Sequence, residues 1–280
     1  MSEDNPFPHS DSVLSALERR RLRFRKIPIR VILPNLVTLL ALAMGLTAIR
    51  YAVEGKFETA VLAVIAAAVL DGLDGRLARA LKGATRFGAE LDSLADFVDF
   101  GVAPSLLLYF WALHNIQSFG WFATLAFAIA AALRLARFNV MADDPARPAW
   151  QSGFFVGMPS PAGAVTVLLP LYLHLSVLEL PASRGLALVV VIYELAIAAL
   201  MASRIPHFSG KRLPRLEREQ IIPLLFVAGA ALVLLATYPM EMLAALSLAY
   251  LASIPFGVRR YSLLAREEAA KVAAQPPSGS

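Results

Sequence analysis

Four aspartates stand out because they fall inside stretches that are otherwise apolar enough for a lipid bilayer. They occupy two short segments, Asp71-Gly72-Leu73-Asp74 and Asp92-Ser93-Leu94-Ala95-Asp96. On a helix that advances about 100° per residue, Asp71 and Asp74 lie on one side, and Asp92 and Asp96 lie one turn apart on one face. Two antiparallel helices joined by a short loop can therefore direct four carboxylates at each other near one membrane surface.

Carboxylates in this position need compensation for their charge. An aspartate at membrane depth costs about 2.5–3.5 kcal/mol, so four without partners would cost roughly 10–14 kcal/mol. Two divalent cations would cancel the four charges, and an all-carboxylate donor set favours Mg²⁺ or Mn²⁺ over zinc, while Ca²⁺ also fits it. Paired metal ions are a recurring device for displacement at phosphorus. We therefore predict two bound divalent ions, Mg²⁺ or Mn²⁺.

Two other interpretations compete with a metal centre. The carboxylates could pair with the basic residues between the two segments, which are Arg76, Arg79, Lys82 and Arg86. They could also serve a cation transporter, which would require further acidic residues along the other helices at mid-depth. Those helices carry almost none, so the acidic groups converge at one site.

The elements that must hold these residues are membrane-spanning helices. The chain has 280 residues, of which 58% are hydrophobic and 17% charged, and its mean hydropathy is +0.63. These values exclude a soluble single-core enzyme and a disordered chain. Eight segments approach the roughly 20 apolar residues that cross a bilayer: 33–53, 57–81, 92–113, 119–140, 161–180, 185–203, 221–237 and 240–258.

We predict an all-α polytopic bundle with a six-helix core and two further C-terminal helices. A re-entrant hairpin over 221–258 would reduce the count to six. The predicted parts are a basic amphipathic segment on the membrane surface (1–30), the core (31–203), a basic loop (204–220), the C-terminal helix pair (221–258) and a disordered cytoplasmic tail (259–280).

The basic residues predict the orientation of the bundle. If the N-terminus is cytoplasmic, 23 of the 26 lysines and arginines fall on the cytoplasmic side, and only Arg50, Lys56 and Arg184 fall outside. Such a bias is the usual topology signal of membrane proteins. The net charge of +5 therefore reflects topology and not nucleic-acid binding. We expect a multi-pass protein of the cytoplasmic membrane with both termini and the carboxylate site facing the cytoplasm.

The carboxylate segments resemble the signature of the CDP-alcohol phosphatidyltransferase family, D-x2-D-G-x2-A-R-x8-G-x3-D-x3-D. Every fixed position is present in this chain: Asp71, Asp74, Gly75, Ala78, Arg79, Gly88, Asp92 and Asp96. The general resemblance extends over the first six helices, and the last two look like an extension found in part of the family.

The resemblance implies a reaction. The four aspartates would hold two metals on the pyrophosphate of CDP-diacylglycerol, and Asp96 would also be the base that deprotonates an acceptor alcohol. Gly75, Ala78 and Arg79 would line the cytidine pocket, and the small residue Gly88 would allow close approach. Asn35 and Thr38, on one face of the first span, could reach the pyrophosphate. The resemblance also implies a homodimer.

Within the family, the chain looks most like members that use L-serine as the acceptor. One resembling stretch runs from Arg134 through Arg137 to Asn139. Arg134 and Arg137 lie three residues apart on one helical face and could bind the serine carboxylate, or they could be anchors at the helix end. Glycerol 3-phosphate, an inositol phosphate and choline are the alternative acceptors. His207 falls in a basic loop with no pattern that suggests catalysis.

Overall fold

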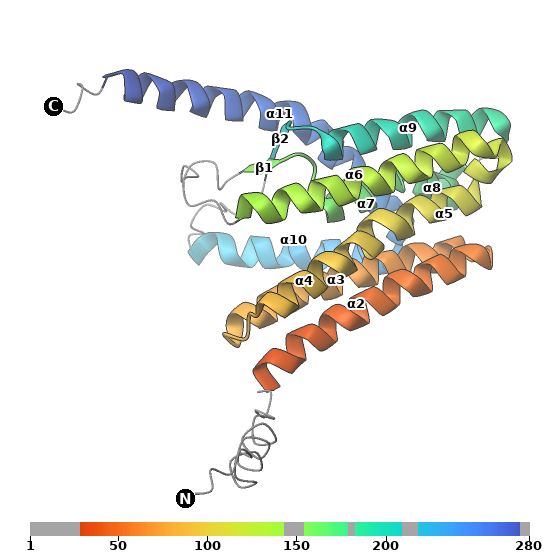
Figure 1. Ribbon diagram of the computed structural model, residues 1–280, viewed down its shortest axis with the longest axis horizontal. Helices are drawn as coiled ribbons and strands as arrows, with labels where there is room; N and C mark the ends of the chain where they lie inside the picture. The colour runs from red at the N-terminus through yellow and green to blue at the C-terminus, as the bar shows by residue number, and fades with distance from the viewer. Residues whose placement is uncertain (1–28, 143–153, 179–182, 209–217, 275–280) are drawn as a thin grey trace, which may run out of the picture.

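The computed structural model describes residues 29–142, 154–178, 183–208 and 218–274. They form a helical bundle with one two-stranded sheet, which confirms the predicted all-α polytopic class (Figure 1). The first half contains α2 (Ile29–Val53), α3 (Phe57–Ala80), α4 (Arg86–Asp96), the π-helix η1 (Phe97–Val102), α5 (Ala103–Trp111), the 3₁₀ turn η2 (Leu113–Ile116) and α6 (Ser118–Ala142). The second half contains β1 (Phe154–Val156), α7 (Ser160–Val167), α8 (Leu169–Leu173), the π-helix η4 (His174–Leu178), α9 (Arg184–Ala202), β2 (Pro206–Phe208), α10 (Arg218–Thr237) and α11 (Pro239–Ala274).

Helix is present in each of the eight predicted apolar segments. Five helical stretches are long and apolar enough to cross a membrane: Ile29–Val53, Arg86–Trp111, Ser118–Met141, Arg184–Ala202 and Pro239–Glu267. The apolar helices Ser160–Ser176 and Ile222–Thr237 are shorter. Helix α3 has 24 residues, and its last turns carry Asp71, Asp74, Arg76 and Arg79. Apart from Glu58 in its first turn, the charged residues of α3 thus lie toward one end of the helix.

Two segments differ from their predicted form. The segment 161–180 is divided, with α7 ending at Val167 and α8 beginning at Leu169. Pro170 provides the reason, because it has no backbone N–H to continue the helical bonding of α7. Helix α11 continues to Ala274, so 259–274 are helical where we predicted a disordered tail. That stretch is rich in Ala, Glu, Lys and Arg, which favour helix even in water.

The remaining parts of these two predictions, 179–180 and 275–280, lie outside the described residues. So do the surface segment 1–28 and the central part, 209–217, of the basic loop.

Small residues bring α2 close to its neighbours. Its buried face runs through Thr38, Ala41, Gly45, Ala48 and Ala52, a repeat of three or four residues. The buried face of α3 is likewise built from alanine and valine. Small side chains allow helix backbones to approach closely in a membrane, where hydrophobicity does not drive helices together. The large side chains of α2, such as Leu36 and Leu46, are exposed on the surface available to lipid.

The polar features gather at one end of the bundle. The start of α2, the α3–α4 turn, the β1–β2 pair and the C-terminal part of α11 all lie toward the left in Figure 1. Strands β1 and β2 are antiparallel, with Phe155 opposite His207. The end that collects these features is the end that we predicted to face the cytoplasm.

The packing at Gly45 yields a stability prediction. A Cβ on Gly45 would collide with the carboxyl group of Asp99 in η1. Asp99 is 1% exposed, so its side chain is enclosed by neighbouring atoms. Gly45→Ala should therefore destabilise the fold by about 1–3 kcal/mol, the usual cost of overpacking, as measured by thermal unfolding in detergent.

Gly229→Ala is the matched control, because a Cβ at Gly229 of α10 would meet nothing within 4 Å. Alanine is the better helix former, so this variant should unfold at or slightly above the wild-type temperature. A Gly45→Ala protein as stable as the control would contradict this account of the packing.

Candidate functional site

The turn between α3 and α4 sets the two carboxylate-bearing helices against each other. Helix α3 ends where Lys82 takes a positive φ of 49°. The amides of Lys82 and Gly83 then bond back to the carbonyls of Arg79 and Ala78 at 3.2 and 3.0 Å, a Schellman-type termination. Helix α4 starts again at once, because the Thr85 side chain accepts a hydrogen bond from the Gly88 amide at 3.0 Å.

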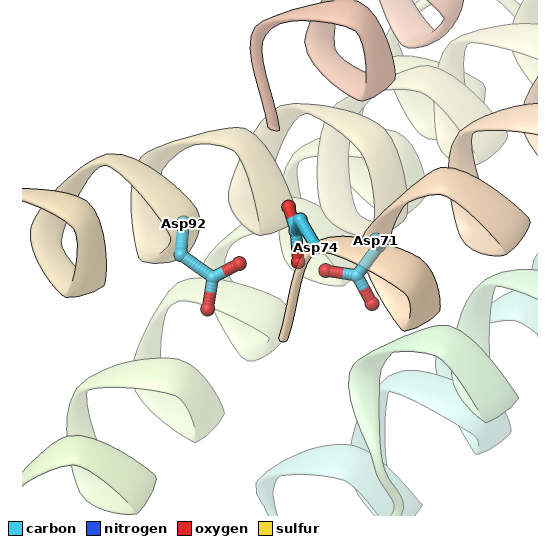
Figure 2. Close-up of side chains that lie close together, drawn as sticks. All are labelled: Asp71, Asp74 and Asp92. Atoms are coloured by element: carbon cyan, nitrogen blue, oxygen red, sulfur yellow. The ribbon is translucent and has the colours of Figure 1, made fainter. Parts of the chain in front are cut away.

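Three of the four predicted aspartates meet across this turn. Asp71, Asp74 and Asp92 each offer a carboxylate oxygen, and these oxygens all lie within 4.8 Å of one another. Figure 2 shows the Asp71 and Asp74 side chains from one helix and Asp92 reaching toward them from the next. Asp74 is buried, while Asp71 and Asp92 are half-buried. The arrangement matches the face-to-face geometry expected from the spacing.

Asp96 completes the group from the last position of α4. Its carboxyl group lies within hydrogen-bonding reach of that of Asp71. The Oδ1 atom of Asp96 is buried and has no hydrogen-bond partner among the described residues. A buried carboxylate oxygen without a partner is costly. The Oδ1 atom of Asp96 therefore calls for a positively charged or hydrogen-bond-donating partner.

The basic residues of the turn between α3 and α4 do not form ion pairs with these carboxylates. In the described part of the chain, the ion pairs are those that Glu54 makes with Arg50 and Lys56, at 2.9 and 2.8 Å. Arg76, Arg79, Lys82 and Arg86 are exposed, so pairing with them does not account for the cluster. Oxygen donors without nitrogen or sulfur suit Mg²⁺, Mn²⁺ or Ca²⁺. The donor set and the orphan oxygen of Asp96 both fit bound divalent ions.

Helix α2 orients one member of the cluster. Thr38 Oγ1 lies 2.6 Å from Asp74 Oδ2 and 3.2 Å from the Pro34 carbonyl oxygen. Its single proton goes to the closer and more negative acceptor, so Thr38 donates to Asp74. A hydrogen bond of this kind fixes a metal-ligating carboxylate in one orientation.

A cavity of about 250 Å³ opens beside Asp74 and Asp92. It is bounded by the ends of α2, α3 and α4 and by the turn between the last two. All six residues predicted to bind CDP-diacylglycerol line it: Asn35, Thr38, Gly75, Ala78, Arg79 and Gly88. A Cβ on Gly88 would stand 2.8 Å from Asn35 Oδ1, so glycine at that position lets α4 approach α2. Arg79 folds back along its own helix, with a guanidinium nitrogen 3.5 Å from where a Gly75 Cβ would be.

A π-helical turn follows the cluster directly. η1 begins at Phe97, immediately after Asp96, and contains Asp99. Such turns rotate the following residues relative to an α-helix and often occur at functional sites. Asp99 is thereby buried against Gly45, and within the described ranges its Oδ1 has no partner. No feature of the sequence predicts this π-helical turn.

The three predicted acceptor-binding residues have different surroundings. Arg134 is only 7% exposed, donates to Ser160 Oγ at 2.9 Å and lies close enough to Asp96 for their charges to interact. Arg137 instead donates to the carbonyls of Ala202 and Ser203 at 2.9 and 3.0 Å, which caps the end of α9. Asn139 is exposed and donates to Ser93 Oγ at 2.9 Å. Of the three, Arg134 is the one beside the carboxylates.

No pattern in the sequence marks His207 and Tyr250 as partners. His207 is 2% exposed, and its ring stacks on that of Tyr250 of α11 with centroids 5.9 Å apart. Burial lowers the pKa of His207 to about 4, so the ring is neutral near pH 7. The pairing joins residues 43 positions apart, which no local pattern predicts.

Glu194 of α9 is a further buried carboxylate, with neither oxygen bonded within the described part of the chain. It is a single residue on its helix, and it is not among the group of acidic residues that could share a metal. It does not form the series of acidic residues that a cation pathway requires.

Comparison with known proteins identifies the family of this chain. The family model described as CDP-alcohol phosphatidyltransferase matches residues 31–202, and the one described as CDP-alcohol phosphatidyltransferase 2 matches residues 219–255. Three similar curated proteins are all named CDP-diacylglycerol–serine O-phosphatidyltransferase.

The relative from Mycobacterium leprae is 39% identical over 250 residues, which is 88% of this chain and 80% of the relative. The one from Mycobacterium tuberculosis (strain ATCC 25618 / H37Rv) is 40% identical over 84% of this chain and 81% of the relative. The one from Bacillus subtilis is 32% identical over 66% of this chain and 96% of the relative. Because the first model covers more than half of the sequence, the chain belongs to the CDP-alcohol phosphatidyltransferase family.

Proposed function

We propose that this protein transfers the phosphatidyl group of CDP-diacylglycerol to the hydroxyl group of L-serine and releases CMP. The observation that carries the proposal is the carboxylate cluster of Asp71, Asp74 and Asp92 with Asp96 beside it, next to a cavity at one end of a membrane bundle. Relatives that match most of the chain bear the name of this activity.

The reaction implied by the family gives Asp96 the role of general base. The serine hydroxyl oxygen attacks the phosphorus that carries diacylglycerol, and the bond from that phosphorus to the oxygen of the CMP phosphate breaks. CMP leaves with the electron pair, and Asp96 accepts the hydroxyl proton. Asp96 suits this role because its carboxyl group is close to those of Asp71 and Asp92 and also interacts with the charge of Arg134.

Asp71, Asp74, Asp92 and Asp96 would hold the two divalent ions, Mg²⁺ or Mn²⁺. Bound ions of this kind neutralise charge on the pyrophosphate and hold attacking and leaving oxygens in line. Thr38 keeps Asp74 in place for that task. The cavity beside the ions would take the nucleotide, with Asn35 and Thr38 toward the pyrophosphate, Gly75, Ala78 and Arg79 around the cytidine, and Gly88 leaving room for close approach.

Arg134 is the residue that we assign to the serine carboxylate. Its guanidinium is nearly buried, and the described residues provide no ion-pair partner for it. A buried cation that makes no direct ion pair, although Asp96 is close enough for their charges to interact, favours a ligand that brings an anion. Arg137, which donates hydrogen bonds to the carbonyls at the end of α9, is the second arginine that we predicted for the acceptor.

We place the protein in the cytoplasmic membrane with its active site facing the cytoplasm, on the strength of the distribution of lysine and arginine. A homodimer stays a prediction that rests on the family resemblance alone.

The acceptor assignment predicts the outcome of a direct assay. Purified protein in detergent, with CDP-diacylglycerol and Mg²⁺ or Mn²⁺, should release CMP when L-serine is added. It should release far less with glycerol 3-phosphate, inositol phosphate or choline. CMP release with glycerol 3-phosphate but not with serine would refute the serine assignment, and no release with any acceptor would refute the enzymatic proposal.

The base assignment predicts the effect of one substitution. Asp96→Asn should lower kcat by about 10²–10⁴-fold, the usual contribution of a general base, while the protein still purifies as a folded species. Glu90→Gln is the matched control, because Glu90 is exposed on the same helix and lines neither the cluster nor the cavity. Near-normal turnover by Asp96→Asn would remove Asp96 from the mechanism.

A further inference from the structure

An apolar groove runs along the surface of the bundle between α6 and α9. These two helices lie side by side (Figure 1), and the groove between them has a volume of about 530 Å³, which is within the usual range of ligand pockets. All of its lining residues are apolar, and all belong to α6 or α9. The groove is therefore separate from the cavity beside the carboxylates, which α2, α3, α4 and the α3–α4 turn enclose.

The sizes of the side chains explain the groove. Its floor consists of alanines, of which Ala130 and Ala198 are buried, and its α6 rim consists of larger, exposed side chains: Phe122, Leu125, Ile129 and Leu133. The rim residues recur every three or four positions, so they follow one face of the helix. From Phe122 to Leu133 this face is about 16 Å long. That length is close to half of the roughly 30 Å hydrocarbon core of a bilayer, the depth that one acyl chain occupies.

A positive charge stands at one end of the groove. Arg137 follows Leu133 by four residues, so it lies one turn further along the same side of α6. Its Nη1 donates to the carbonyls of Ala202 and Ser203 at 2.9 and 3.0 Å, and Ala202 itself lines the groove. The ion pairs of the described residues do not include Arg137. The other N–H groups of its guanidinium can therefore bind an anion.

The form of the groove indicates the form of its occupant. The occupant must be apolar along its length and negatively charged at the end that meets Arg137. A phospholipid has this form, because an acyl chain is joined to a phosphate near the membrane surface. We place this end of α6 at the cytoplasmic surface, where anionic lipids attract lysine and arginine. A second copy of the chain would cover the alanines but would have no need of the charge.

We propose that the groove between α6 and α9 binds one acyl chain of an anionic phospholipid of the bilayer, with the lipid phosphate at Arg137. This inference goes beyond the proposed function, because the bound lipid is not consumed in the reaction. It gives Arg137 a partner other than the acceptor, whose carboxylate we assign to Arg134. A lipid bound in this way joins the ends of α6 and α9 and stabilises the folded protein by mass action.

Lipid binding to the purified protein in detergent tests this inference. Phosphatidylglycerol, which is anionic, should bind and raise the unfolding temperature. Diacylglycerol with the same acyl chains lacks the charge, and inorganic phosphate lacks the chains, so each should bind at least about tenfold more weakly. Native mass spectrometry measures the bound lipid, and thermal unfolding measures the shift.

Two pairs of variants locate the site. Arg137→Gln should weaken phosphatidylglycerol binding about tenfold, as expected for the loss of a charge-assisted hydrogen bond. Ala199→Phe should weaken it at least as much, because Ala199 is an exposed residue that lines the groove and a phenyl ring would fill the space. The controls are Arg184→Gln, at the opposite end of α9, and Ala196→Phe, on α9 outside the groove. Both should bind the lipid as the wild type does.

The lipid-induced shift is compared within each variant, so a change in basal stability does not affect the result. Binding of phosphatidylglycerol by Arg137→Gln and Ala199→Phe that is as tight as in the two controls would overturn the inference. So would equal binding of phosphatidylglycerol and diacylglycerol. Loss of a dimer in Ala199→Phe with lipid binding unchanged would overturn it in favour of a second copy. The proposed transfer reaction is tested separately, by CMP release.

Discussion

Four carboxyl groups within a bundle of membrane helices must have their charge compensated, and the rest of the structure depends on this constraint. Left unpaired at membrane depth, they would cost roughly 10–14 kcal/mol, which is comparable to the whole stability of a typical domain. The nearby arginines and lysines of the α3–α4 turn are exposed and make no ion pair with the cluster in the described structure. Divalent ions, and a substrate that binds to them, are the compensation that fits an all-oxygen site.

The surrounding helices can be understood as the means of holding that cluster. Thr38 of α2 fixes Asp74, and Gly88 lets α4 approach α2 closely enough for Asn35 to line the same cavity. The π-helical turn after Asp96 directs Asp99 into the core, where Gly45 leaves space for it. Arg134 brings a buried positive charge close enough to Asp96 for the two to interact, and we propose that the acceptor carboxylate binds there.

The carboxylate site was predictable from the sequence because its spacing is local. Asp71 with Asp74, and Asp92 with Asp96, are placed by helical periodicity alone, and a short turn brings the pairs together. Features that depend on distant contacts were not predictable. Arg137 was grouped with Arg134 by spacing, yet it caps α9, some 65 residues further along the chain. His207 seemed to be an ordinary loop residue, and its burial against Tyr250 follows from the docking of α11. The division of 161–180 and the helical extension to Ala274 follow from Pro170 and from local helix propensity.

The central claim is that the four aspartates bind two divalent ions, and Mn²⁺ provides the most direct measurement because it is paramagnetic. Titration of the purified protein with Mn²⁺, followed by low-temperature electron paramagnetic resonance, should reveal two bound ions per chain with a spin-coupled signal. That signal should be lost in Asp71→Asn and Asp92→Asn and kept in Glu90→Gln. Wild-type protein that binds no more Mn²⁺ than the two aspartate variants would contradict the account.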